Sequence, residues 1–549
     1  MYRPLCQWIV LLTFAASCFG QPVLRSTSPV VSSASFRTPG LPGSGIARGS
    51  IFSIFGDGLG PTPYVQNGQF PLPTKLAGTS VTVTVAGTSV PALVVLAYRY
   101  QVNAILPSDT PAGSGILTVT YNGETSAPAP IEVVNTAFGI YTFFSRGGQA
   151  VVTDLNYRPN SIISTLHPGD IAILWGTGLG PITTSDADVP PAGNLPGTVK
   201  VHVGNTTATV SYAGRSGCCS GLDQIAFQVP AGVQGCQVPI AVETGGFVSN
   251  IATIAVSASG QTCSDSAMGQ DLVDRLAAGN TVDFGYVRLE SLIAQFIPGS
   301  TAYASEDFAY ASFSEYTPQT AGLAQYGVSG NYCVAVDCSY GCGAVTMDGT
   351  LADSSPAQLD AGSMAIQGQT TASLSGLGPS SAYGAYLNSN ISRFLWSGLK
   401  YTVSGAGGSK IGAFSASETT GTAGVTLANL TSGQTLPLSG DLTVQWTGGD
   451  AKLQNGMVTI GGFSAVDANY SQWVLFQCSA PATAHSFTIP GWILSTLPRS
   501  GTGQQGTISY PLGWIWIGQY SNPVTFTAPG LDRGLITDVF FNGFGVYFQ

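Results

Sequence analysis

Hydrophobic and polar residues alternate along many short stretches of this chain, and glycine, proline and asparagine separate the stretches. Valines alternate with threonines in residues 81–85, and valines alternate with Lys200 and His202 in residues 199–203. A period of two is typical of strands that bury one face. Turn residues follow about every ten positions. The pattern therefore predicts short antiparallel strands packed as β-sandwiches.

One sequence motif occurs twice in the chain. Residues 49–61 and residues 169–181 are each an apolar, strand-like run broken by Gly-x-Gly-Leu-Gly-Pro. Later segments match in the same order, as Gln101–Pro107 does with Gln224–Pro230, so the front half is a tandem duplication. We expect these glycines to shape corners, with Leu59 anchored in the core. A nucleotide-binding loop is disfavoured, because no helix pattern and no Lys-Ser/Thr follow.

The repeated motif and two neighbouring segments resemble a known protein family. Residues 30–36, 49–61 and 101–107 resemble IPT/TIG-like, immunoglobulin-type modules of uncharacterised secreted proteins from environmental bacteria. The resemblance covers about residues 28–258, and segments such as 400–408 are similar to the C-terminal regions of the same protein group. It implies two Ig-like repeats outside the cell, at 28–137 and 138–262. It implies no reaction, because such modules occur in receptors, in adhesins and as spacers.

The composition changes after Cys263, and residues 264–549 are expected to form one large β-rich unit or two smaller ones. Ser264 and Asp265 can cap a short helix that places Met268, Leu272 and Leu276 on one face and ends at Gly279. Strand-like segments follow at 307–316, 364–374, 401–416, 442–446 and 472–478. The predicted fold class is all-β: two tandem Ig-like β-sandwiches, then a larger β-rich unit with one short helix.

The first twenty residues are typical of a secretory signal peptide. Arg3 precedes an apolar segment, residues 8–16, that is too short for a stable membrane anchor. An alternative is lipidation of Cys18, because residues 15–18 resemble a weak lipobox. No later stretch contains 18 uninterrupted apolar residues, so no transmembrane helix is predicted. We therefore expect a secreted or cell-surface bacterial protein.

Charge excludes one class of partner. The net charge is −10 and the pI is about 4.6, so the chain lacks the basic surface that nucleic acid requires.

Eight cysteines remain after the leader, and in an exported chain they indicate disulfides of undetermined connectivity. A zinc site at Cys333, Cys338 and Cys342 is disfavoured because Cys-x2-Cys spacing and a nearby histidine are absent. No metal or cofactor is predicted. The eight are Cys218, Cys219, Cys236, Cys263, Cys333, Cys338, Cys342 and Cys478.

Carboxylates could support glycoside hydrolysis, which needs two of them across a cleft. Glu306, Asp307 and Glu315 lie in an aromatic-rich segment, and on a strand Asp307 and Glu315 would share one face while Glu306 points away. Adjacent acids are common in loops, so catalysis there is the weaker interpretation.

Two other side-chain sets contain residue types that bind metals or act in catalysis. Asp57, Asp186 and Asp188 could meet calcium, but no ligand loop of known spacing surrounds them. The three histidines, His167, His202 and His485, have no partner at metal or triad spacing and are interpreted as solvated or core residues.

Aromatic residues near the C-terminus provide the candidate binding site. Trp514, Trp516 and Tyr520 occupy alternate positions, so an extended strand would present them on one face, with Ile515 and Ile517 inward. Exposed rings of this kind stack on sugars. The other interpretation, which the pattern favours, is that the tryptophans form the core and the isoleucines meet a second layer.

Together these patterns favour an exported, non-catalytic surface-binding or adhesion protein with polysaccharide or another surface molecule as partner. The alternatives are a glycan-active hydrolase that uses paired carboxylates and a purely structural envelope component. The oligomeric state is not predicted.

Overall fold

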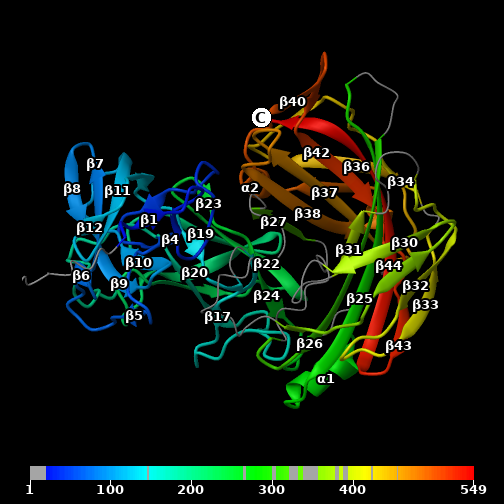
Figure 1. Cartoon of the computed structure of the whole chain (residues 1–549), viewed down its shortest axis with the longest axis horizontal. Coiled ribbons are helices and arrows are strands. Elements are labelled where there is room, and N and C mark those ends of the chain that lie inside the picture. Colours follow the sequence, from blue (N-terminus) through cyan, green and yellow to red (C-terminus); the bar gives the residue numbers. More distant parts are fainter. Residues whose placement is uncertain are drawn as a thin grey trace, which may run out of the picture.

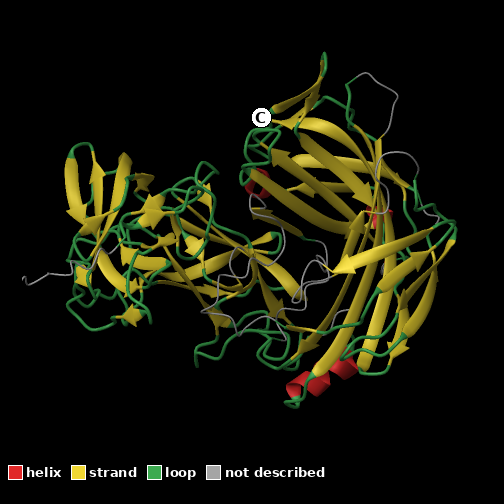
Figure 2. Ribbon diagram, in the orientation of Figure 1, coloured by secondary structure: helices red, strands yellow, loops and turns green. Residues whose placement is uncertain are grey.

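The computed structural model describes residues 20–144, 147–263, 268–298, 304–320, 332–337, 356–376, 383–386, 393–421, 424–453 and 456–549. The expected signal segment and Cys18 lie outside these residues. The fold is all-β, as the sequence predicts, with two small modules beside a larger C-terminal unit (Figures 1 and 2).

Module 1 is a sandwich of two sheets. Alternating residues of β7 are buried, and they pack on Phe52 and Ile54 from the opposite sheet. The first sheet contains β1 (Val23–Leu24), β2 (Val30–Ser32), β4 (Ile51–Asp57), β5 (Val65–Gln66), β9 (Leu93–Ala97) and β10 (Gln101–Ile105). The second contains β3 (Ile46–Ala47), β6 (Lys75–Leu76), β7 (Thr79–Val85), β8 (Thr88–Pro91), β11 (Gly113–Tyr121), β12 (Glu124–Thr125) and β13 (Ala129–Val134).

Module 2 repeats this arrangement as one continuous sheet that encloses its own core. The first residues of β20 pair with β19 and the remaining ones pair with β21. Ile225, Phe227 and Ile240 pack inside. Its strands are β14 (Gly139–Ile140), β15 (Thr142–Phe144), β16 (Gly147–Ala150), β17 (Val152–Thr153), β18 (Ile171–Thr177), β19 (Val199–Val203), β20 (Thr206–Arg215), β21 (Asp223–Gln228), β22 (Gly235–Thr244), β23 (Phe247–Val248) and β24 (Ala252–Val256).

The two modules are joined by a buried polar interface. Arg215 of module 2 is 1% exposed, and its guanidinium pairs with Asp223 and donates to Gly49 O of module 1 at 2.8 Å. Asp223 accepts the backbone N–H groups of Gly178 and Leu179 at 2.7 and 2.8 Å. Burial raises the pKa of Asp223, while Arg215 and these two N–H groups oppose the rise. The second glycine corner is therefore part of a packed junction.

One large sheet dominates the C-terminal unit, and Figure 1 shows it curving from β38 and β37 through β42 to β44 and β25. The long strands β25 and β44 run parallel at its centre. In spatial order its strands are β27 (Cys333–Asp337), β38 (Trp473–Pro481), β37 (Met457–Ala465), β42 (Gly513–Gly518), β44 (Leu531–Phe548), β25 (Val282–Gln295), β26 (Ala304–Tyr316), β31 (Tyr383–Tyr386), β30 (Thr371–Gly376), β29 (Met364–Gln367), β32 (Lys400–Gly405) and β33 (Phe414–Thr419).

Shorter elements complete the unit. β28 (Ala357–Gln358), β35 (Thr435–Leu436) and β43 (Val524–Ala528) pair with strands of the large sheet. A small sheet contains β34 (Val425–Leu427), β36 (Leu442–Gly448) and β39 (Ser486–Ile489), and β40 (Thr502–Gln505) pairs with β41 (Ile508–Pro511). Two predicted strand segments, 364–374 and 401–416, each form a hairpin of two strands.

The predicted helix is present as α1 (Gln270–Ala277), but the predicted cap is wrong. Gly269 occupies the N-cap position with no side-chain cap, and Ser264 and Asp265 lie outside the described residues. Leu272 and Leu276 are buried on one face, and Gly279 follows the helix with a φ of 89°. A second helix of one turn, α2 (Gly491–Leu494), was not expected from the sequence. In the described residues, no helix reaches the length and hydropathy that a membrane-spanning segment needs.

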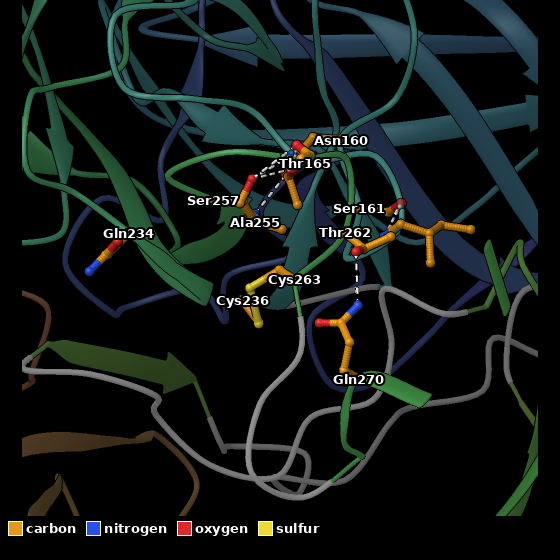
Figure 3. The surroundings of a disulfide bond; sticks show 12 residues. Asn160, Ser161, Thr165, Gln234, Cys236, Ala255, Ser257, Thr262, Cys263 and Gln270 are labelled. Atoms are coloured by element: carbon orange, nitrogen blue, oxygen red, sulfur yellow. Dashed lines mark hydrogen bonds between the residues drawn. A yellow bond between two sulfur atoms is a disulfide. The ribbon is translucent and has the colours of Figure 1, made fainter. Parts of the chain in front are cut away.

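Three disulfides account for six of the eight predicted cysteines. Cys218 pairs with its neighbour Cys219, and Cys333 joins β27 to β38 by pairing with Cys478. Cys236 pairs with Cys263 and fastens the end of module 2 to β22 (Figure 3). Cys338 and Cys342 lie outside the described residues.

Candidate functional site

The large sheet has two chemically different faces. One face carries Ile460, Phe476, Ile515 and Ile517 in one apolar cluster, and Val287, Leu289 and Ile536 in another. Residues that pair across neighbouring strands point to the same side, so both clusters lie on the same face, called here the core face. The opposite face is called the aromatic face. Strand register places aromatic residues on this face from most strands, and Phe284 and Tyr316 among them are buried against α1. They are Phe284, Tyr286, Phe296, Phe308, Tyr310, Tyr316, Phe463, Trp473, Trp514, Trp516, Tyr520, Phe541 and Tyr547.

Trp514 and Trp516 lie on the aromatic face. The intervening residues Ile515 and Ile517 are fully buried in the core, whereas both indole side chains remain partly exposed. Neither tryptophan belongs to an apolar core cluster of the described chain. The alternation therefore gives the arrangement expected of a binding platform, with the isoleucines inward.

Neighbouring rings hold the tryptophans in place. Trp514 stacks on Phe463 with centroids 5.2 Å apart, and Phe296 from the end of β25 lies 4.0 Å from it on centroids. Phe463 also meets Trp473 at 5.6 Å and Trp516 at 6.2 Å. Five aromatic residues from four segments thus form a cluster whose rings hold one another in place.

Glycines form the floor below Trp516. A Cβ atom on Gly461 would lie 2.4 Å from Nε1 of Trp516, and one on Gly543 would lie 2.8 Å from its Cβ. Gly461 and Gly543 are the residues that pair with Trp516 on either side. Because both lack a side chain, the indole lies close against the backbone.

Tyr520 joins the aromatic cluster to a polar region of the same face. Its ring lies 6.1 Å from Phe541, which in turn lies 6.3 Å from Trp516. Its hydroxyl is hydrogen-bonded to Arg288 of β25, and burial raises the pKa of Tyr520. Electrostatic interaction with Tyr520 is the main reason that the pKa of Arg288 is raised. Trp514, Trp516 and Tyr520 therefore share one face, as predicted. Tyr520 connects the aromatic cluster to Arg288 and is not part of the cluster itself.

Arg288 and Glu290 provide the polar groups beyond Tyr520. Arg288 Nε lies 3.2 Å from Glu290 Oε2, and their side chains are 39% and 21% exposed. Tyr310 pairs with Arg288 across β26 and is 39% exposed. Charged and hydroxyl groups are thus available to a ligand at this end of the aromatic face.

The candidate carboxylates do not form a catalytic pair. Asp307 is 1% exposed and accepts the backbone N–H groups of Phe394 and Leu395 at 2.6 and 2.8 Å, so it stabilises a chain turn. Glu315 shares its face, as expected, but eight residues of strand separate the two by about 26 Å. Glycosidase carboxylates lie within about 10 Å of each other, so the hypothesis of this pair is wrong. Glu306 points to the aromatic face and is exposed.

The histidines make structural contacts. His167 Nε2 lies 2.7 Å from Gly260 O, and His202 stacks on Trp492 at 4.9 Å beside Glu243. Burial lowers the pKa of His202. His485 is exposed at a turn with a φ of 51°. These placements agree with their interpretation as solvated or core residues.

Two of the three aspartates that could meet calcium have other partners. Asp57 pairs with Arg99 at 2.8 Å, and Asp186 accepts Ser108 N at 2.6 Å across the module junction. Asp188 is exposed. Within the described parts of the chain, no group of three His, Cys, Asp or Glu side chains could hold a metal ion.

Sequence reasoning missed most of the aromatic face. Phe463 and Trp473 lie on strands about fifty and forty residues before Trp514, and Arg288 lies more than two hundred residues before it. The one available signal was the glycine at 461, which interrupts an apolar strand and marks a close approach of another group.

Comparisons with known proteins leave the chain without an assigned family. No family model matches it, and no curated protein matches it. The resemblance to IPT/TIG-like modules therefore stays a prediction.

Solved structures give only distant likenesses. The Bacteroides ovatus mixed-linkage glucan utilization locus protein SGBP-B, in complex with a mixed-linkage heptasaccharide, is 14% identical with a TM-score of 0.14, covering 87% of this chain and 93% of that one. The S-layer protein SbsC is 10% identical with a TM-score of 0.18, covering 95% of this chain and 54% of that one. Immunoglobulin domains 1–4 of Sidekick-1 are 10% identical with a TM-score of 0.13, covering 94% and 99%. TM-scores this low support no argument about function.

Proposed function

We propose that this chain is an exported, non-catalytic surface protein and that its aromatic face binds polysaccharide. One observation carries the proposal. Trp514 and Trp516 are partly exposed on the side of the sheet opposite to Ile515 and Ile517, which already complete the core. Together with Phe463, Phe296 and Trp473 these tryptophans form a contiguous aromatic patch, and contiguous apolar patches outside the core mark binding sites.

The chemistry of this face suits a sugar. A pyranose ring presents C–H groups on its flat faces, which pack on indole rings, and hydroxyl groups at its edge. Trp514 and Trp516 supply the apolar surface, and the ring contacts with Phe463 keep both indoles oriented. A few convergent polar groups then fix orientation in a mostly apolar site. Arg288, Glu290 and Tyr310 lie on the same face and supply such groups.

The two modules support this role mechanically. Leu41 of module 1 and Val248 and Ile251 of module 2 are buried in the same apolar cluster as Ile515. The modules therefore pack against the C-terminal unit and would hold its sheet in a fixed orientation at the cell surface.

Substitution of the tryptophans tests the proposal. We expect Trp514→Ala and Trp516→Ala each to weaken retention on polysaccharide by about tenfold or more, since a buried aromatic anchor contributes more than about 1.4 kcal/mol. Retention is measured on a panel of insoluble polysaccharides and by affinity electrophoresis. Thermal unfolding reports whether each variant remains folded.

Trp396→Ala is the matched control, because Trp396 is 43% exposed and lies outside the aromatic face. Its retention should equal that of the unsubstituted protein. Folded Trp514→Ala and Trp516→Ala variants that bind as well as this control would show that the aromatic face is not the site.

A further inference from the structure

The aromatic face extends well past the tryptophans as a continuous series of contacts. Trp516 lies 6.3 Å from Phe541, Phe541 lies 6.1 Å from Tyr520, and the Tyr520 hydroxyl is hydrogen-bonded to Arg288. Trp516 and Phe541 lie on the neighbouring strands β42 and β44, Tyr520 follows β42 and bridges to Val539 of β44, and Arg288 lies on β25, on the other side of β44. The series thus has an apolar end and a polar end.

Strand register gives the length of this series. Trp516 pairs with Gly543, and Gly543 pairs with Ala294 of β25. Arg288 lies six residues earlier on β25, which is about 20 Å along the strand, and two strand spacings add about 10 Å sideways. The two ends are therefore about 22 Å apart. That distance is several times the width of one sugar ring.

The polar end also restricts the charge of a ligand. Arg288 is already paired with Glu290 at 3.2 Å, and Glu306 is exposed on the next row of the same face, where it pairs with Leu292. An acidic sugar would meet two carboxylates and one compensated guanidinium. Neutral hydroxyl groups can accept from Arg288 and donate to Glu290 or Glu306 without any unpaired charge.

We infer that the aromatic face binds a neutral, linear polysaccharide chain that runs from Trp514 and Trp516 to the Arg288–Glu290 pair. This inference rests on the proposed function, which requires only that the tryptophans bind sugar. It adds that several consecutive sugar units are bound at once, and that acidic glycans are discriminated against.

Calorimetry on the full chain tests both additions. The probes are neutral cello-, xylo-, manno-, malto-, laminari- and chito-oligosaccharides from the disaccharide to the hexasaccharide, with oligogalacturonates and alginate oligomers as acidic probes. We expect one neutral series to bind with an affinity that rises with length up to at least the tetrasaccharide. Acidic oligomers of equal length should bind at least tenfold more weakly.

Variants at the polar end separate this inference from the proposed function. Arg288→Gln should lower the affinity for the hexasaccharide by about tenfold, to that of a shorter oligomer, and leave the disaccharide affinity unchanged. Tyr310→Ser is the second variant, because Tyr310 is exposed and its replacement leaves the core intact. It should show the same loss confined to long oligomers. Arg158→Gln, which changes an exposed arginine of module 2 paired with Asp154, is the matched control and should bind every length normally.

Each outcome has a defined meaning. An affinity that does not rise beyond the disaccharide, or a folded Tyr310→Ser variant that binds the hexasaccharide normally, overturns the extended site even if Trp516→Ala still abolishes binding. Tighter binding of oligogalacturonate or alginate overturns the neutral ligand. No binding of any probe overturns the proposed function and this inference together.

Discussion

Removal of the Arg215 charge should loosen the junction between the two modules. Arg215 and Asp223 are 1% and 0% exposed, and the guanidinium also donates to Gly49 O and Gly180 O at 2.8 and 2.7 Å. Arg215→Met keeps most of the side-chain volume but leaves the Asp223 carboxylate buried without its counter-ion. The loss of one partner of a buried ion pair costs about 3–5 kcal/mol.

Local hydrogen exchange is the appropriate assay, because a chain of several modules does not unfold in a single two-state step. The backbone N–H groups of Gly178 and Leu179 donate to Asp223, so they report the opening of this junction directly. A loss of about 3–5 kcal/mol corresponds to exchange that is faster by about a hundredfold to about four thousandfold. Peptides from the large sheet of the C-terminal unit should exchange at unchanged rates.

A double variant distinguishes lost charge balance from general damage. Arg215→Met with Asp223→Asn removes both charges and leaves an amide oxygen to accept the same N–H groups, so most of the protection should return. Arg158→Met, in an exposed ion pair of the same module, should leave the exchange of Gly178 unchanged. Equal exchange in Arg215→Met and the unsubstituted protein would refute the reasoning. So would a double variant that exchanges as fast as the single one.

Two further predictions concern stability. Burial and the neighbouring Asp538 carboxyl raise the pKa of Glu418 to about 8. The folded state therefore holds this proton more tightly than the unfolded state does. The free energy of unfolding should fall by about 3–5 kcal/mol as the pH rises from about 5 to above 8. Glu418→Gln should abolish this fall in thermal unfolding measured across that range, and an identical pH dependence in both proteins would contradict it. The Cys333–Cys478 disulfide spans 145 residues, whereas the Cys218–Cys219 disulfide spans one. In the chain-entropy model, replacement of the first pair by alanine should therefore lower the free energy of unfolding by about 4–5 kcal/mol. Replacement of the second pair should lower it far less. Equal changes in the midpoint of thermal unfolding would count against this ranking.

Local pattern predicted the fold class because each strand carries its own period. The alternating residues of β7 and β19 point inward as the sequence indicates, and Leu59 and Leu179 are buried at their glycine corners. The pairing of β25 with β44 could not be predicted. These strands are parallel and more than two hundred residues apart, and no turn signal links them. The predicted helix start is also wrong, because the N-cap is Gly269 and not the polar pair at 264–265.

In the candidate site, too, local alternation was predictable from the sequence and the contacts between distant strands were not. Alternation placed Trp514 and Trp516 opposite Ile515, but alternation is symmetrical and left open which side is the core. The decision is made by distant strands: Phe476 and Ile460 cover one side, and Gly461 and Gly543 leave space for an indole on the other. Asp307 and Glu315 were likewise placed on one face correctly, and only the length of β26 shows that they cannot act together.

The duplicated glycine phrase shows how two copies of one local structure acquire different roles. In module 1, Asp57 pairs with Arg99 at an exposed corner. The aligned residue in module 2 is Thr177, whose hydroxyl accepts Ile51 N of module 1 at 2.9 Å and donates to Gly221 O at 2.6 Å. Burial of a charged residue at this position would carry a large desolvation cost, whereas a hydroxyl can accept and donate at once.

The residue before Gln101 in module 1 and the aligned residue before Gln224 in module 2 show a similar difference in burial. Tyr100 in module 1 is 42% exposed, and the aligned residue in module 2 is Asp223, which is fully buried and binds two N–H groups of its glycine corner. Both changes convert a solvent-facing corner into a surface that accepts a neighbouring module. Repetition of the phrase therefore predicts that two corners have the same backbone shape, while the residues beside the phrase decide which corner is covered. In module 2 these residues are Thr177 and Asp223.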